Sequence, residues 1–176
     1  MIRQATAADL AQIEDAYDEH FAFETAHPER AFTVFRKGVY PTRRDAEKAL
    51  ADGGLTVFEE DGRILASVIT SGVQPPEYAH VPWQRALDAS QVRVIHLLMV
   101  RPSAAGRGIG ATLMRYIEAQ ARAEGIRALR LDTGSQNAPA VHLYEKCGFK
   151  IVARAAMQVG GVVPHDGHLF LEKCLD

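Results

Sequence analysis

The stretch "SAAGRGIGATLM", Ser103–Met114, places glycines at three alternate positions, 106, 108 and 110, directly before a helical pattern. Glycine lets the backbone bend sharply and come close to a ligand, and the first N–H groups of a helix have no partner inside the helix. These properties suit a phosphate group, and Arg107 adds a full positive charge to the same loop. A tight strand-to-helix turn without a ligand is the alternative that the glycines alone leave open.

The elements on either side of this stretch predict a sheet covered by helices. "VRVIHLLMV", Val92–Val100, is apolar on both faces, as in a central strand. Ile109–Glu124 repeats apolar side chains at helical spacing, and the strand "RALRLDT" follows. Other patterns predict strands at Ile2–Ala5, Leu55–Glu59, Ile64–Thr70, Phe149–Arg154 and His168–Lys173, and helices after Thr6–Asp9, within Arg44–Gly54 and over Asn137–Lys146. Irregular structure is expected over Phe21–Arg44 and Val73–Gln91, and turns at Asp61–Gly62 and Asp166–Gly167.

Composition limits the class of protein. The chain has 176 residues, of which 47% are hydrophobic and 24% charged, and this predicts one soluble α/β domain. The acidic and basic residues are spread along the chain and give a net charge of −2, so neither a nucleic-acid partner nor an anionic-membrane anchor is expected. No leader pattern follows Met1 and no apolar run reaches ~18 residues, so we expect a cytoplasmic protein. Cys147 and Cys174 are expected to be reduced.

Two other phosphate-binding loops are weaker matches. A mononucleotide P-loop needs Gly-Lys-Ser/Thr at the helix start, and the lysine is absent here. Gly106, Gly108 and Ala111 satisfy the dinucleotide pattern G-x-G-x-x-A, and Asp132 ends the next strand. However, too little chain follows Asp132 to complete a doubly wound nucleotide domain. Dinucleotide binding is therefore kept as a third interpretation.

A second motif, "NAPAVHLYEKCGF", Asn137–Phe149, follows at a set distance from "MVRPSAAGRGIGATLM", Met99–Met114. Together they resemble the GNAT superfamily of acyl-CoA-dependent N-acetyltransferases. The likeness extends over Ile2–Phe149, although the specific motifs occupy only Leu98–Leu113 and Asn137–Phe149. The resemblance implies a single N-acetyltransferase domain, 1–176, of mixed α/β (α+β) class. Its central sheet would be mixed and mostly antiparallel, splayed between the fourth and fifth strands, with helices on both faces.

The resemblance also implies where acetyl-CoA, the cosubstrate, would bind. The backbone groups of the fourth strand would pair with the pantetheine arm, the glycine loop would hold the pyrophosphate, and an asparagine of the second motif would orient the pantetheine. These groups are Leu98, Met99 and Val100, then Gly106, Arg107, Gly108, Ile109, Gly110 and Ala111, and finally Asn137. Ala105 stands where the family usually has Gln or Arg, so one side-chain contribution to the phosphates is missing.

Amine acylation requires a neutral nucleophile, stabilisation of the oxyanion and a proton for the departing thiolate. Tyr144 matches the family's tyrosine at the coenzyme sulfur and would donate that proton. His96 and Asp132 are the candidates for the base, acting directly or through water, and an ordered water alone is the third. Each also has a plain structural interpretation: a core tyrosine, a core histidine and a turn-capping acid.

Three other histidines are given no catalytic role. His165 and His168 flank a predicted turn and lack a third ligand, so no metal is expected, and His142 is expected to be exposed. Eight residues of the two variable segments could form the acceptor pocket or simply belong to the core. They are Phe21, Phe23, Glu24, Phe32, Phe35, Tyr40, Tyr78 and Trp83.

The interpretation is an acetyl-CoA-dependent N-acetyltransferase that acts on a primary amine of a small molecule or amino acid by direct attack in a ternary complex. The alternatives are a protein or peptide N-acetyltransferase and a non-catalytic acyl-CoA-binding or regulatory module. The identity of the amine and the oligomeric state, a homodimer included, stay open.

Overall fold

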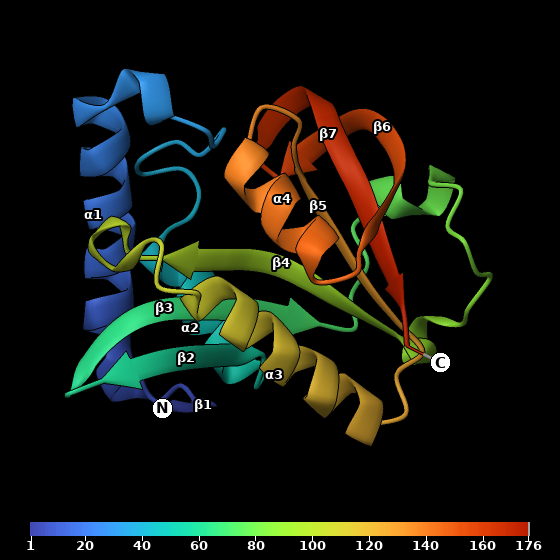
Figure 1. The fold of residues 1–176 in the computed structure, drawn as a ribbon, viewed down its shortest axis with the longest axis horizontal. Coiled ribbons are helices and arrows are strands. Elements are labelled where there is room, and N and C mark those ends of the chain that lie inside the picture. Colours follow the sequence, from blue (N-terminus) through green and yellow to red (C-terminus); the bar gives the residue numbers. More distant parts are fainter. Residues whose placement is uncertain (176) are drawn as a thin grey trace.

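A seven-stranded sheet runs through the molecule in the order β1-β2-β3-β4-β5-β7-β6 (Figure 1). The computed structural model describes residues 1–175, and Asp176, the last residue of the expected domain, lies outside them. The strands are β1 (Ile2–Gln4), β2 (Leu55–Glu60), β3 (Arg63–Ser71), β4 (Val92–Val100), β5 (Ala128–Gly134), β6 (Lys150–Val159) and β7 (Val163–Cys174). The helices are α1 (Leu10–Ala26), α2 (Arg43–Ala51), α3 (Ile109–Ala123) and α4 (Ala138–Lys146), with short 3-10 helices that include η3 (Pro76–His80) and η4 (Ala89–Gln91).

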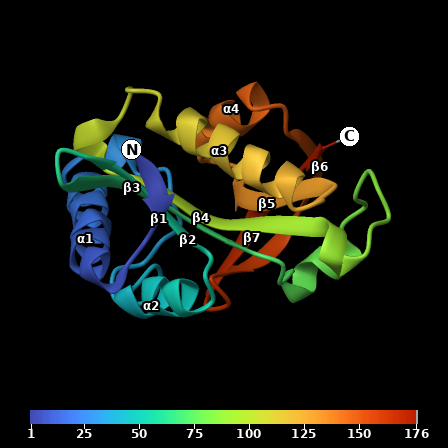
Figure 2. The same ribbon diagram turned by 90° about the horizontal axis from the view of Figure 1, so that it is seen from below.

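Helices cover both faces of the sheet, as expected. Figure 2 shows α3 and α4 on one face and α1 and α2 on the other. Leu113 and Ile117 of α3 and Tyr144 of α4 pack with the first face, whereas Ile13 and Tyr17 of α1 pack with the second. None of the helices in residues 1–175 combines the length and the apolar character that spanning a membrane requires.

The sheet opens between β4 and β5, which confirms the expected splay. The two strands are parallel and pair only over Val92–Ile95 and Ala128–Leu131, while all other neighbouring strands are antiparallel. Beyond these pairs the strands diverge (Figure 1). His96 lies at a bulge, because Ile95 and Leu97 pair with consecutive residues of β3. A bulge bends its strand and increases the twist, so His96 marks the point where β4 leaves β5.

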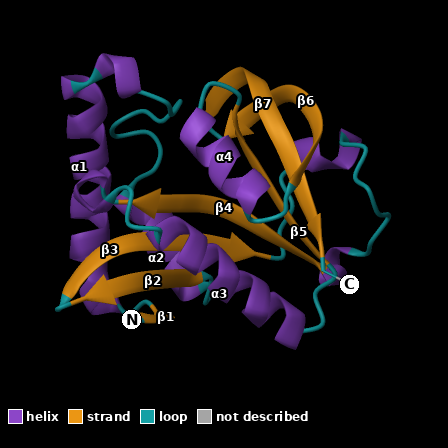
Figure 3. Cartoon of the chain, viewed as in Figure 1, coloured by secondary structure: helices purple, strands orange, loops and turns teal. Residues whose placement is uncertain are grey.

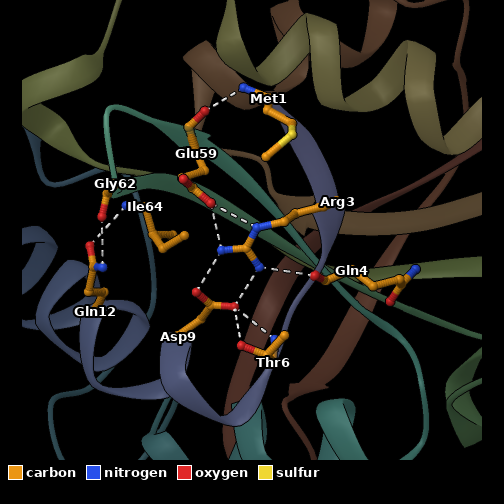
Figure 4. Close-up of polar contacts among 9 residues, drawn as sticks. All are labelled: Met1, Arg3, Gln4, Thr6, Asp9, Gln12, Glu59, Gly62 and Ile64. Carbon is orange, nitrogen blue, oxygen red and sulfur yellow. Dashed lines mark hydrogen bonds and ion pairs between the residues drawn. The ribbon is translucent and has the colours of Figure 1, made fainter.

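The predicted start of the first helix is correct, and a charge cluster secures it. Thr6 and Asp9 form the capping box, with the Asp9 carboxylate accepting from the Thr6 amide at 2.7 Å. Arg3 of β1 donates to both Asp9 oxygens, at 2.7 and 2.8 Å, and to Glu59 of β2 at 2.8 Å (Figure 4). The Arg3 guanidinium lowers the pKa of Asp9 to about 2. The cluster therefore ties the helix start to the sheet edge.

The end of the first helix and the position of the last turn were predicted wrongly. Helix α1 continues to Ala26, although irregular structure was expected from Phe21. The hairpin between β6 and β7 turns over residues 160–162, where Gly160 and Gly161 both have positive φ angles. Asp166–Gly167 is not a turn but lies inside β7, at a shift in register between the two strands. The last two strands are consequently longer than the sequence indicates.

The long connection between β3 and β4 is irregular, as expected, apart from η3 and η4 (Figure 3). A buried ion pair fixes it to the sheet: Arg130 Nε of β5 lies 3.0 Å from Glu172 Oε1 of β7. The guanidinium also stacks on Trp83 at 4.3 Å, and the Glu172 carboxylate accepts from the amide of Gln84 at 2.7 Å. These contacts hold η3 against the sheet, with Tyr78 only 2% exposed.

Candidate functional site

A cavity of about 500 Å³ lies where β4 and β5 part. It is lined by the glycine loop, the second half of β4, the end of β5, α4, and the end of α1 with the segment that follows. Every candidate from the sequence except Arg107 lines it. They are His96, Leu98, Met99, Val100, Gly106, Gly108, Ile109, Gly110, Ala111, Asp132, Asn137 and Tyr144. The open gap in the sheet thus brings the candidate binding and catalytic residues to one place.

The glycine loop has the geometry of an anion cradle. Gly106 and Gly108 have φ angles of +78° and +75°, a left-handed conformation that L side chains rarely adopt, and space is open where a Cβ would lie. Gly108 precedes the first residue of α3, and Thr112 is the first residue whose amide bonds back to the Gly108 carbonyl, at 3.0 Å. The amides of residues 109–111 have no acceptor within the helix, so they are free to bind an anion.

The third glycine has a different role. A Cβ on Gly110 would lie 3.0 Å from the Leu143 side chain, so this glycine lets α3 pack closely against α4. The entry to the loop is also fixed, because the buried Arg101 side chain donates to the Ile64 carbonyl and to Glu19 of α1, each at 2.7 Å. The same Glu19 carboxylate accepts from the Ser103 amide at 2.9 Å. The loop therefore begins from a rigid support.

Arg107 does not face the cavity in this structure. Its guanidinium is exposed and binds both oxygens of Glu60 on β2, at 2.9 and 2.7 Å. Ala105, which replaces the family's usual polar residue, lines the cavity instead. The loop consequently presents backbone amides, rather than a side-chain charge, to the space before α3.

The outer edge of β4 is free to pair with an extended ligand. Leu98, Met99 and Val100 pair with β3 on one side but have no partner on β5. Unpaired N–H and C=O groups along such an edge can bind an amide-rich chain as an added strand. On the far side, Asn137 caps α4, where its Oδ1 accepts from the Ala140 amide at 3.3 Å.

Two ionisable residues line the cavity from the β5 side of the gap, Tyr144 of α4 and Asp132 near the end of β5. Burial raises the pKa of Tyr144, and the nearby Asp132 charge adds to this, so the phenol is protonated at neutral pH. Burial also raises the pKa of Asp132 to about 6, although the Tyr78 hydroxyl donates to Oδ2 at 2.8 Å and favours the charged form. Asp132 therefore changes charge close to neutral pH, as a general base should.

His96 also lines the cavity, but a neighbour engages it. The Ser71 hydroxyl lies 2.7 Å from His96 Nε2, and the Ser71 oxygen accepts from the Val73 amide at 3.0 Å. Burial lowers the pKa of His96, with a smaller contribution from Lys48, so the ring is neutral at pH 7. The ring is a possible proton acceptor only through the nitrogen that Ser71 leaves free.

The family model for "Acetyltransferase (GNAT) family" matches residues 11–149, which is most of the chain. The chain belongs to the GNAT acetyltransferase family. Its members are N-acetyltransferases, so the protein is an acyltransferase enzyme, and the expected family and enzyme class are confirmed. The family uses acetyl-CoA. Within residues 1–175, no three His, Cys, Asp or Glu side chains are grouped so as to hold a metal ion.

Three curated relatives are similar to this GNAT enzyme. A mycothiol acetyltransferase of Cellulomonas flavigena is 34% identical over 119 residues, which cover 66% of this chain and 31% of that protein. The chain thus spans about a third of that relative. The peptidyl-lysine N-acetyltransferase YiaC of Escherichia coli is 29% identical over 152 residues (86% and 84%). An L-methionine sulfoximine/L-methionine sulfone acetyltransferase of Salmonella typhimurium is 30% identical over 162 residues (90% and 84%).

Among solved structures, yncA of Salmonella typhimurium, determined with its cofactor acetyl-CoA, has the same fold. The TM-score is 0.66 at 23% sequence identity, and the match covers 100% of this chain and 94% of that one.

Sequence reasoning missed two residues of this GNAT site. Tyr78 belongs to the core, which was one of its two expected places, but its hydroxyl also donates to Asp132. His168, which was given no catalytic role, has Nε2 at 3.5 Å from Asp132 Oδ1 and lines the cavity. No local pattern connects them with Asp132, because they lie on η3 and β7. Only the antiparallel pairing of β7 with β5, which places His168 opposite Gly134, brings His168 to the end of β5.

The expected acceptor segment divides between cavity and core. Phe23, Glu24, Phe32 and Phe35 line the cavity, whereas Tyr40, Tyr78, Trp83 and Phe21 pack in the hydrophobic clusters. Glu24 holds the segment after α1 in place, because its carboxylate accepts from the Thr33 amide at 3.0 Å and from the Thr33 hydroxyl at 2.9 Å. This end of the cavity is therefore a mainly aromatic wall that also includes His20, Arg30 and the Glu24 carboxylate, which already has partners.

Proposed function

We propose that this enzyme transfers the acetyl group of acetyl-CoA to the primary amine of a small molecule or amino acid, by direct attack in a ternary complex. The observation that carries the proposal is the cavity between the diverging ends of β4 and β5. One end meets the free amides of the glycine loop, Tyr144 and Asp132 stand beside it, and the other end reaches the aromatic segment after α1.

The residues present suit acetyl-CoA, which supplies an activated acetyl thioester. The amides of Ile109, Gly110 and Ala111 would bind the pyrophosphate, helped by the positive end of the α3 dipole. The free edge of β4 at Leu98–Val100 would pair with the pantetheine amides, and Asn137 would orient the same arm. Arg107 would reach the phosphates only by leaving Glu60, which is an exposed partner and so holds it weakly.

Asp132 is the base in this proposal. A primary amine enters as an ammonium ion and must lose a proton before it can attack. The Asp132 carboxylate lines the cavity, and burial sets its pKa to about 6, so at pH 7 it is ionised and able to accept that proton. His96 is the second candidate, and its position at the bulge of β4 is its main support.

Tyr144 is the acid in this proposal. The thiolate that leaves the thioester needs a proton, and burial keeps the phenol of Tyr144 protonated well above neutral pH. Tyr144 sits on α4, opposite the free edge of β4, where the end of the pantetheine arm would arrive. The two proton transfers are then divided between two residues, one on β5 and one on α4.

The relatives leave two classes of acceptor for comparison. One is named for mycothiol and another for L-methionine sulfoximine and sulfone, which are small molecules, whereas YiaC is named for peptidyl-lysine. The cavity favours a small acceptor, because the aromatic side chains Phe23, Phe32 and Phe35 line its far end. An amine with an apolar body fits such a wall better than a highly charged acceptor does.

The test is release of CoA thiol from acetyl-CoA in the presence of single amines. The panel contains amino acids, aliphatic and aromatic primary amines, and lysine-containing peptides. We expect amine-dependent release with a small amine, and double-reciprocal lines that intersect, as a ternary complex requires. Release with peptides alone would replace the small acceptor by a protein, and acetyl-CoA binding without release for any amine would indicate a binding module.

A further inference from the structure

Two histidines stand behind Asp132, in a line that leads away from the cavity. His168 of β7 is buried, and its Nε2 lies 3.5 Å from Asp132 Oδ1. Its other ring nitrogen, Nδ1, lies 2.7 Å from Nδ1 of His165, which is partly exposed and does not line the cavity. The row Asp132, His168, His165 therefore connects the cavity with the surface of β7.

The backbone decides which ring nitrogen carries the proton. The Gly167 amide lies 3.3 Å from His165 Nδ1 and donates to it, so that nitrogen is an acceptor. The short contact between the two Nδ1 atoms then requires His168 to donate from its own Nδ1. A neutral His168 ring with a proton on Nδ1 has a lone pair on Nε2, directed at Asp132. His168 can accept a proton from Asp132 at this position.

The groups around Asp132 and His168 favour Asp132 over His168 as the residue that holds a proton at rest. Two groups of η3 act on Asp132: the Tyr78 hydroxyl donates to it, and the negative charge of Glu77 raises its pKa. The charge of Asp132 in turn raises the pKa of Tyr144 and of Tyr40. Beside His168 the ionisable neighbour is His165; from β6, the Arg154 guanidinium approaches Gly167. Burial raises the pKa of Asp132 to about 6 and lowers that of His168 to about 4.

We propose that His168 and His165 act behind Asp132 and carry the amine proton from it to solvent. The proposal rests on the proposed function. The substrate ammonium gives one proton to the Asp132 carboxylate, and Asp132 passes it to His168 Nε2. His168 then releases its Nδ1 proton to His165 Nδ1, and His165 loses a proton from Nε2 to water. After the product leaves, water in the cavity takes the Nε2 proton of His168, which lines the cavity. His165 then regains an Nε2 proton from solvent and returns its Nδ1 proton to His168, so one proton has passed from the ammonium to water and no other reactant is consumed.

The first test measures activity in low and high concentrations of imidazole buffer. His165→Ala, at a partly exposed position, should lower kcat about tenfold in dilute buffer without imidazole. The kcat should recover as the imidazole concentration rises, since this small base replaces the missing ring. His168→Gln keeps a polar side chain but cannot take a proton, so kcat should fall at least as much as in His165→Ala. Imidazole should not restore it, and the acetyl-CoA affinity should be unchanged. His80→Ala, an exposed histidine of η3, is the matched control and should show neither effect.

Wild-type kcat and pH profile in both His165→Ala and His168→Gln would overturn the proposal. A loss in His165→Ala that imidazole does not restore would reduce the pair to a structural role and overturn it as well. These outcomes are separate from failure of the proposed function, because in that case the wild-type enzyme would transfer no acetyl group to any amine.

A second test does not depend on activity. The nitrogen chemical shifts of the histidine rings report which nitrogen carries a proton, and we expect His168 to carry it on Nδ1 in the wild-type protein. Asp132→Asn removes the partner that favours the imidazolium, so the titration of His168 should move to lower pH by about one unit, whereas His80→Ala should leave it in place. A proton on Nε2 of His168, or a titration that Asp132→Asn does not move, would overturn the proposal.

Discussion

Gly108→Ala tests whether the glycine loop binds the coenzyme, because the chain contains a closely matched control. Gly108 lies at one end of α3 and lines the cavity, and Gly125 lies beyond the other end, away from it. Their φ angles are +75° and +74°, and at both positions a Cβ would meet no atom within 4 Å. Alanine should therefore cause the same backbone strain at both positions, and only at Gly108 should it project into the coenzyme site.

The size of each effect follows from the geometry. A non-glycine residue in the left-handed region costs about 1–2 kcal/mol, so both variants should lose this amount of unfolding free energy. In a chain of 176 residues each kcal/mol lowers Tm by roughly 2–4 °C. At Gly108 the methyl group would also push the pyrophosphate away from one or two amides. Each hydrogen bond to a charged group contributes ~1.5 kcal/mol or more, so the Kd for acetyl-CoA should rise ten- to a hundredfold.

The assay combines urea unfolding of both variants with calorimetric titration of acetyl-CoA. We expect equal losses of stability, unchanged acetyl-CoA affinity in Gly125→Ala, and weakened affinity in Gly108→Ala. Wild-type affinity in Gly108→Ala would refute the reasoning, since the loop would then not approach the phosphates. Equal weakening in both variants would refute it too, because the effect would come from strain in α3 rather than from the loop.

Three further predictions concern the catalytic residues and their support. Tyr144→Phe should lower kcat by about 10²-fold or more with little change in acetyl-CoA affinity, and stopped-flow or steady-state CoA release with calorimetry will measure both. Burial raises the pKa of Asp132 from 3.8 to about 6, so its contribution to stability is present below pH 4 and is lost as pH rises to 6. The free energy of unfolding of Asp132→Asn, measured in urea, should therefore increase relative to the wild type over that range, by up to ~3 kcal/mol, and a constant difference would contradict this. Glu172→Gln should lower the free energy of unfolding by ~3 kcal/mol because it leaves Arg130 buried without its counter-charge. A loss below ~1 kcal/mol, measured by urea unfolding, would contradict the view that this ion pair fixes the β3–β4 connection.

The features that local rules govern could be predicted from the sequence. The apolar run of β4, the alternate glycines and the capping box depend on neighbouring residues, and the structure has all three where they were expected. The splay of the sheet came from the family resemblance, and the bulge at His96 supplies its physical cause. The bulge itself could not be predicted, because Val92–Val100 gives no sign of an unpaired residue.

The errors have physical causes as well. Gly160–Gly161 and Asp166–Gly167 are both good turn pairs, and the alternation that would distinguish them is weak because β6 is mostly exposed. Helix α1 was predicted too short because aromatic residues lower helix propensity. Packing of Phe21 against the core and the bonds between Glu24 and Thr33 stabilise its last turns instead.

Part of the candidate site depends on contacts between distant segments. Tyr78 and Asp132 are 54 positions apart, and Tyr78 reaches Asp132 only because the long connection is fixed by the buried pair of Arg130 and Glu172. His168 reaches the same carboxylate through the register of β7 with β5. A carboxylate at the end of a strand can be found in a sequence, but the residues that set its pKa cannot.

The central claim is that acetyl-CoA enters the gap between β4 and β5 and delivers its thioester between Tyr144 and Asp132. A crystal structure of the protein with acetyl-CoA tests this most directly. We expect the pyrophosphate on the amides before and within the first turn of α3, the pantetheine along Leu98–Val100, and the sulfur within hydrogen-bond distance of the Tyr144 hydroxyl. A coenzyme bound outside the gap, or a thioester beyond the reach of both Tyr144 and Asp132, would contradict the account.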